Sequence, residues 1–234
     1  MKFGGASVAE NLKRAIASGS VVEDADGTLS LKDRRASGNV WVFVANGPPM
    51  GCDFLMHFLF DKAYGKSAVP HGCRDCYKVK VALRTLRELV AAWEIAKGIE
   101  CRSKWGLDLF NPYSQNVYAG YFYTPGLEAA RVLYKVVREA FAADPKLGPD
   151  VAMTIKRGCS EYEAALGPSD RYEFTPEMDE LEAYLKPKFR PRKSDPGNVA
   201  MAGWIDAAFR MGDDTYLDFT GGKRLRPKTV AYDP

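Results

Sequence analysis

Five cysteines are the residues of this chain whose types and spacing could do chemistry. Cys73 and Cys76 are separated by two residues, a spacing that lets both sulfurs turn toward one metal or cluster. Cys52, Cys73 and Cys159 each follow a glycine, which admits backbone conformations that let a chain wrap closely around a sulfur-bound centre. In a reducing compartment such cysteines are more often ligands or redox groups than halves of disulfides. The pattern therefore predicts a cysteine-ligated centre.

The candidate ligands are all five cysteines and one histidine: Cys52, Cys73, Cys76, Cys101, Cys159 and His71. Cys52, Cys73 and Cys76 are the first choice, and the fourth ligand is Cys101 or Cys159. Four thiolates suit electron transfer or a structural role. Three would leave one iron of a cubane cluster open, so that it could hold substrate and act as a Lewis acid.

Zinc and an iron–sulfur cluster both accept four thiolates, and spacing alone seldom separates them. A compact zinc ribbon usually has two Cys-x2-Cys pairs. This chain has one such pair, and its other cysteines are dispersed along the sequence. Dispersed ligands that converge at one edge of a sheet suit a buried cofactor, so we favour an iron–sulfur cluster, with zinc as the alternative.

Two alternatives involve no metal. In the first, Cys52 is a nucleophile, activated by the N-terminus of the helix that follows it and by His57 or His71. This alternative leaves the pair Cys73 and Cys76 unexplained. In the second, the five thiols are unrelated, because a buried cysteine can serve as a small hydrophobic residue.

The elements around Cys52 define its expected position. Residues 40–44 form a β-branched, apolar strand that ends in a glycine- and proline-rich loop, and residues 53–62 form an apolar helix. Cys52 then lies where the loop meets the helix N-terminus, a position that stabilises a thiolate. Upstream, residues 21–31 read as a small hairpin with an Asp-Gly turn.

A strand over 117–124, a helix over 127–142 and a strand over 151–156 read as a βαβ unit. Parallel strands bring their C-terminal ends to one edge of a sheet, where Cys52 and Cys159 could then meet. We therefore expect a mixed α/β fold. It has a central, largely parallel sheet with flanking helices, a small N-terminal hairpin and an irregular C-terminal extension.

The expected organisation has three parts. Residues 1–185 form the main α/β domain with the cysteine site, 186–198 a basic, proline-rich linker or arm, and 199–234 a C-terminal helix and tail packed on the main domain. Lysine and arginine interleaved with proline resist helix formation. The basic segments 186–193 and 223–228 could contact nucleic acid or an acidic protein.

Composition restricts the remaining possibilities. The net charge is only +3, too small to argue for nucleic acid over the whole surface. No apolar stretch approaches the roughly 18 residues that span a bilayer, and the N-terminus lacks the pattern of a secretory signal, so we expect a cytoplasmic protein without membrane contact. The phosphate-binding, dinucleotide-binding, serine hydrolase and zinc protease motifs are absent.

These observations predict a cysteine-ligated iron–sulfur protein, acting as a redox or cluster-dependent enzyme, an oxidoreductase or lyase, on an unidentified small molecule or redox partner. The first alternative is a zinc-stabilised binding module that contacts nucleic acid or an acidic protein through its basic C-terminal segments. The second is an enzyme with a Cys/His nucleophile.

Overall fold

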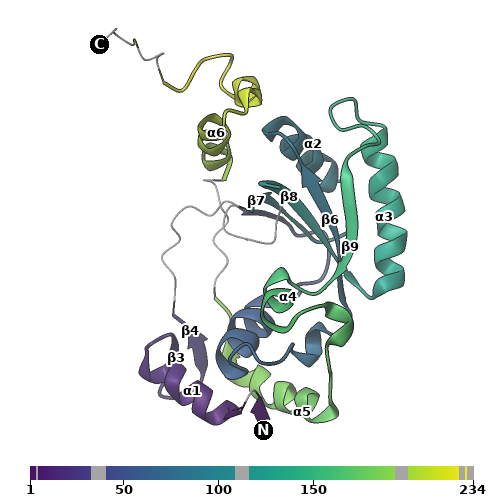
Figure 1. The fold of residues 1–234 in the computed structure, drawn as a ribbon. Helices are drawn as coiled ribbons and strands as arrows, with labels where there is room; N and C mark the ends of the chain where they lie inside the picture. Colours follow the sequence, from purple (N-terminus) through teal and green to yellow (C-terminus); the bar gives the residue numbers. More distant parts are fainter. Residues whose placement is uncertain (4, 33–40, 109–115, 193–199, 227–229, 231–234) are drawn as a thin grey trace.

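The main sheet of the computed structural model has five strands and is antiparallel throughout (Figure 1). The structure describes residues 1–3, 5–32, 41–108, 116–192, 200–226 and 230. The expectation of a central, largely parallel sheet is therefore wrong. In spatial order the strands are β5 (Trp41–Val44), β7 (Ser103–Leu107), β8 (Tyr118–Pro125), β6 (Cys76–Leu83) and β9 (Ala152–Arg157).

The difference lies in how two crossover helices connect the strands. Helix α2 (Leu86–Ala96) joins β6 to β7, and α3 (Leu127–Ala142) joins β8 to β9. Each helix connects two strands of the same direction, but an opposite strand lies between them: β8 in the first case and β6 in the second. This is the split βαββαβ order with β5 added at one edge. The topology by itself implies no function.

Alternation along the strands directs one face of the sheet toward α2 and α3. Val79, Val81 and Phe122 lie on this face and belong to the largest core cluster. Trp105 is fully buried there, and an added Cβ at Gly120 would lie 2.1 Å from its ring. Glycine at this position therefore makes room for the indole.

A second layer with its own hydrophobic core forms the lower part of the molecule in Figure 1. The expected hairpin is present in it as β3 (Val21–Glu23) and β4 (Leu29–Leu31), paired antiparallel. The wide π-helix η1 runs from Asp53 to Ala63 and buries Phe58 and Leu59 in this core. The layer also contains β1 (Lys2–Phe3), β2 (Ala6–Ser7), α1 (Val8–Ala17), α5 (Pro176–Leu185) and β10 (Phe189–Arg190).

The basic segment after α5 is part of this layer as far as residue 192. After a 3-10 turn, η4 (Lys186–Lys188), strand β10 pairs in parallel with β4. Arg190 forms an ion pair with Asp24, and Arg192 donates to Asp53 through its backbone and its guanidinium. These arginines are consequently paired within the fold. Residues 193–198 of the expected arm, and 227–228 of the second basic segment, lie outside the described residues.

The C-terminal region packs against α2. Helix α6 (Ala200–Met211) places Trp204 edge-on against Trp93, and the Asp213 carboxylate accepts from the backbone N–H of Leu86 at 2.7 Å. The 3-10 helix η5 (Asp214–Phe219) follows.

Within the described ranges, no helix has the length and apolarity needed to cross a membrane.

Two glycine substitutions test the packing of the sheet against α2 and α3. Gly120→Ala should lower the free energy of unfolding by roughly 1–3 kcal/mol, because the new methyl group would overlap the Trp105 ring. Gly203→Ala, in α6 and facing open space, should raise it by about 0.5–1 kcal/mol. Chemical denaturation of both variants measures the difference. A Gly120→Ala variant as stable as the parent would contradict the close contact.

Candidate metal centre

Four of the five cysteines meet where the sheet joins the second layer. Cys52 is the N-cap of η1, and Cys73 ends the 3-10 turn η2 (His71–Cys73). Cys76 begins β6, and Cys159 is the N-cap of α4 (Ser160–Leu166). Every pair among these four thiols is close enough for one thiolate to disfavour ionisation of another. The four sulfurs therefore form one group.

The strand pairing of β6 with β9 brings two of these cysteines together. The Gly158 N–H donates to the Cys76 carbonyl at 2.8 Å, which continues the ladder by one residue and places Cys159 beside Cys76. Gly158 has a φ of +67°, in the left-handed region that favours glycine. At the Gly72–Cys73 junction the reason is space, since an added Cβ would lie 2.7 Å from Leu55.

A buried carboxylate holds the turn that carries Cys73. Glu182 of α5 is only 5% exposed and accepts three hydrogen bonds. The donors are the Tyr64 hydroxyl at 2.8 Å and the backbone N–H groups of His71 and Gly72 at 2.6 and 2.9 Å. Because two of these donors directly precede Cys73, α5 fixes the direction in which the chain enters the site.

The protein surroundings favour the neutral form of most of these thiols. Burial, together with the neighbouring thiols, raises the pKa of Cys52 and of Cys73 above the ordinary value and that of Cys76 to about 11. The Cys73 sulfur also lies 3.3 Å from the hydroxyl of Tyr162. Thiols in such an environment ionise when a bound cation compensates their charge.

A buried lysine contacts the group of thiols. Lys78 of β6 is 5% exposed, and its ammonium donates to the Cys159 sulfur at 3.0 Å. The same Nζ lies 5.1 Å from the centre of the Tyr123 ring. Burial opposes the charged form, but the attraction of Cys159, Tyr123 and Cys76 outweighs it and holds the pKa of Lys78 above its ordinary value. Lys78 thus supplies a positive charge at the edge of the sulfur group.

A cavity of about 310 Å³ opens beside Cys52 and Cys159. It lies over the face of the sheet that α2 and α3 leave uncovered. Lys104 of β7 lines it, with Nζ 4.2 Å from the Trp41 ring centre and 4.9 Å from that of Tyr121. The cavity therefore combines cations, aromatic walls and two of the four clustered thiols.

Two of the predicted ligands lie apart from the group. Cys101 packs in the core beneath α2 and α3, and its thiol donates to the Tyr123 carbonyl at 3.2 Å. His71 lies 3.2 Å from Asp179 through Nδ1. The structure thus brings together Cys52, Cys73, Cys76 and Cys159, and leaves Cys101 and His71 outside.

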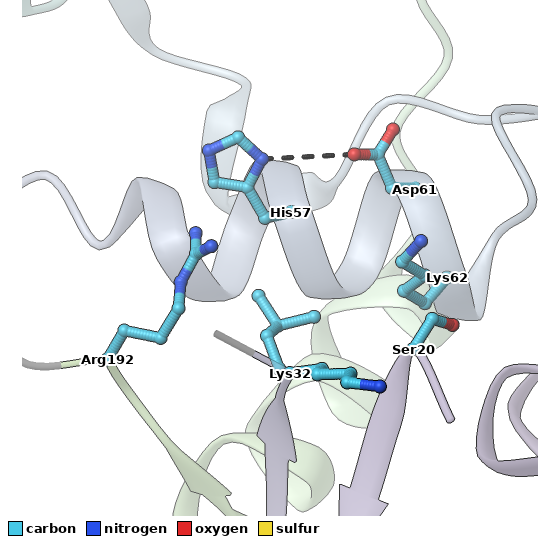
Figure 2. Close-up of a pocket in the computed structure, with 7 residues that line it drawn as sticks. Ser20, Lys32, His57, Asp61, Lys62 and Arg192 are labelled. Carbon is cyan, nitrogen blue, oxygen red and sulfur yellow. Dashed lines mark ion pairs between the residues drawn. The ribbon is translucent and has the colours of Figure 1, made fainter. Parts of the chain in front are cut away.

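His57 lines the cavity beside Cys52 and Cys159 and also a second cavity. Its Nδ1 lies 3.8 Å from Asp61 on the same helix, and both residues line a second cavity of about 420 Å³ (Figure 2). Lys32 and Arg192 lie around this cavity, and the charge of Arg192 is already engaged by Asp53. Across the described residues, no hydrogen bond joins His57 to a cysteine.

Within the described ranges, no group of three or more His, Cys, Asp or Glu side chains has the arrangement that would hold a metal ion. Comparison with protein-family models, with curated proteins and with solved structures finds no match for this chain.

Proposed function

We propose that Cys52, Cys73, Cys76 and Cys159 bind an iron–sulfur cluster, and that the chain is a cluster-dependent redox protein. The observation that carries this proposal is the gathering of four thiols, three of them buried and Cys52 half-buried, from three separate segments, with the buried ammonium group of Lys78 donating to Cys159. Cysteines that serve only as small hydrophobic residues need no such convergence. Nor do they need a buried cation as neighbour.

The balance of charge supports bound metal. An ammonium group buried without an anion costs several kcal/mol, and the Lys78 ammonium has a sulfur, not a carboxylate, as its acceptor. Metal binding ionises all of its thiol ligands. A cubane core of charge about +2 with four thiolates carries a net charge of about −2, which Lys78 partly neutralises.

The choice of a cluster over zinc is supported by the spacing of the ligands. The chain has one Cys-x2-Cys pair, whereas a compact zinc ribbon usually has two. The other two cysteines of the group, Cys52 and Cys159, come from separate segments at the starts of η1 and α4. Dispersed ligands of this kind suit a buried cofactor better than a small zinc fold. Zinc remains the alternative metal.

A bound cluster would supply electron transfer, to a small molecule or to a redox partner. The protein would hold it between the layers, with Cys73 and Cys76 on a turn fixed by Glu182. Cys52 is the least buried of the four ligands and lines the cavity beside them. Exchange with a small molecule is therefore most direct on the Cys52 side.

A second candidate function rests on the hydrogen bond between Lys78 and Cys159. Lysine stabilises a thiolate, and Cys159 lines the cavity, so the pair could form a metal-free cysteine nucleophile. The pairing of Cys52 with a histidine stays a separate prediction, and Cys52 and His57 line the same cavity. The candidate with Cys159 gives no role to Cys73 or Cys76.

Metal content separates these functions. Protein purified without oxygen should be brown and contain iron and acid-labile sulfide in equal amounts, about four of each per chain. Alanine at position 52, 73, 76 or 159 should remove most of the iron. The matched control, Cys101→Ala, should retain it, because Cys101 lies in the helix-covered core. Colourless protein with one zinc per chain would favour zinc, and folded metal-free protein would favour the Cys159 nucleophile.

The charge of Lys78 should raise the reduction potential, because it stabilises the more negative, reduced form of the cluster. Lys78→Met should therefore lower the midpoint potential while iron content is preserved. Lys80→Met is the control, since Lys80 lies two residues further along the same face of β6 and does not line the cavity. Spectroelectrochemical titration measures both. Equal potentials in the parent and Lys78→Met would refute the placement of Lys78 beside the cluster.

A further inference from the structure

The cavity beside Cys52 and Cys159 has a chemistry that the cluster alone does not explain. Its floor is the uncovered face of the main sheet, with Lys104 and Tyr121 at adjacent positions of β7 and β8. Its other walls come from η1, through Cys52 and Met56, and from the start of α4. At about 310 Å³ it lies at the small end of the range of roughly 300–1,000 Å³ for ligand pockets. It has room for a small molecule.

Lys104 is the side chain in this cavity whose charge is not matched. Among the described residues its ammonium makes no hydrogen bond and no ion pair, and it lies over the rings of Trp41 and Tyr121. Burial, and to a lesser extent the nearby Lys78 ammonium, lowers the pKa of Lys104, although Cys159, Glu161 and Asp108 attract its charged form. The charge is therefore only partly compensated, and an anion in the cavity would complete the compensation.

The other charged groups that line the cavity do not neutralise the charge of Lys104. Lys156 already donates to Glu163 at 2.6 Å and to Ser160 at 2.9 Å. Asp108 accepts from the Tyr121 hydroxyl at 2.9 Å, and neither Asp108 nor Glu161 lies within 4 Å of a lysine ammonium in the cavity. Lys78 and Lys104 therefore line the cavity, and among the described residues neither ammonium forms an ion pair with a carboxylate.

We propose that this cavity binds a small molecule that carries a carboxylate or phosphate group, with the anionic group on Lys104 and the less polar part against Trp41 and Tyr121. The rings offer flat apolar surface, and the lysine offers a charge-assisted hydrogen bond. The identity of this molecule as the substrate of the cluster rests on the proposed function. Its binding does not, because Lys104 is not one of the cysteine ligands.

The position of the cavity defines what the bound molecule would contact. Cys52 and Cys159 line the same space as Lys104, so a molecule held by Lys104 lies against two of the four proposed ligands. It would shield that side of the cluster from water. The cavity thus provides a binding place for the small-molecule partner of an electron-transfer centre.

Three aromatic probes of similar shape test the proposal: benzoate, phenyl phosphate and the neutral benzamide. Each is titrated into the anaerobically purified protein and followed by calorimetry. Benzoate or phenyl phosphate should bind at least ten times more tightly than benzamide. Lys104→Met should weaken the binding of the anionic probe at least ten-fold, Lys104→Arg should retain it, and Lys80→Met, outside the cavity, should not change it.

The iron content of the titrated protein keeps the two proposals separate. Anion binding that depends on Lys104, in protein that contains no iron even when purified without oxygen, would support the cavity and contradict the cluster. Iron-loaded protein that binds benzoate no better than benzamide, and phenyl phosphate no better either, would overturn the anion site alone. Binding that Lys104→Met leaves unchanged would also overturn it. Circular dichroism of each variant identifies any that fails to fold, and Lys104→Arg then decides between a charge effect and a packing effect.

Discussion

A positive charge buried among sulfur atoms is the constraint on which the site depends. Lys78 of β6 is almost fully buried, so water solvates its ammonium poorly, and its acceptor is the sulfur of Cys159. A neutral thiol is a poor partner for a buried cation, whereas a thiolate is a good one. Several thiolates in one buried place need additional positive charge. The proposed metal centre would supply this charge, and its thiolate ligands would compensate the Lys78 ammonium.

The fold provides this environment through the alternation of its strands. The central strands turn side chains such as Val79, Val81 and Phe122 toward α2 and α3, so that Tyr121 and Tyr123 fall on the opposite face. On an isolated sheet that face would contact water. Here η1 and α4 cover part of it, and each begins at one of the four cysteines. The cover that buries Lys78 is thus the same cover that delivers Cys52 and Cys159.

The sequence indicates which cysteines lie together better than it indicates the sheet. The Cys-x2-Cys spacing and the glycine before Cys52, Cys73 and Cys159 pick out the four residues that meet. The spacing of the cysteines could not show whether Cys101 or Cys159 joins the other three. That choice depends on which face of the sheet each side chain lies on, and this is set by the positions of the neighbouring strands. The order of the strands could not be predicted for a similar reason. The periodicity of the sequence indicates a helix between two strands, but it does not show that a third strand lies between those two strands in the sheet.

The local sequence pattern does not show that Lys78 is buried. Residues 77–81 alternate as an exposed strand would, and lysine on one face of such a strand ordinarily reads as the solvent side. What buries Lys78 is contact with segments far away in the sequence, which no local pattern reports.

The central claim, that four cysteines hold a multi-iron centre, is tested most directly by X-ray absorption at the iron edge of anaerobically purified protein. The account predicts a first shell of sulfur alone and a second shell of iron. A first shell of oxygen or nitrogen, or the absence of an iron–iron distance, would contradict it.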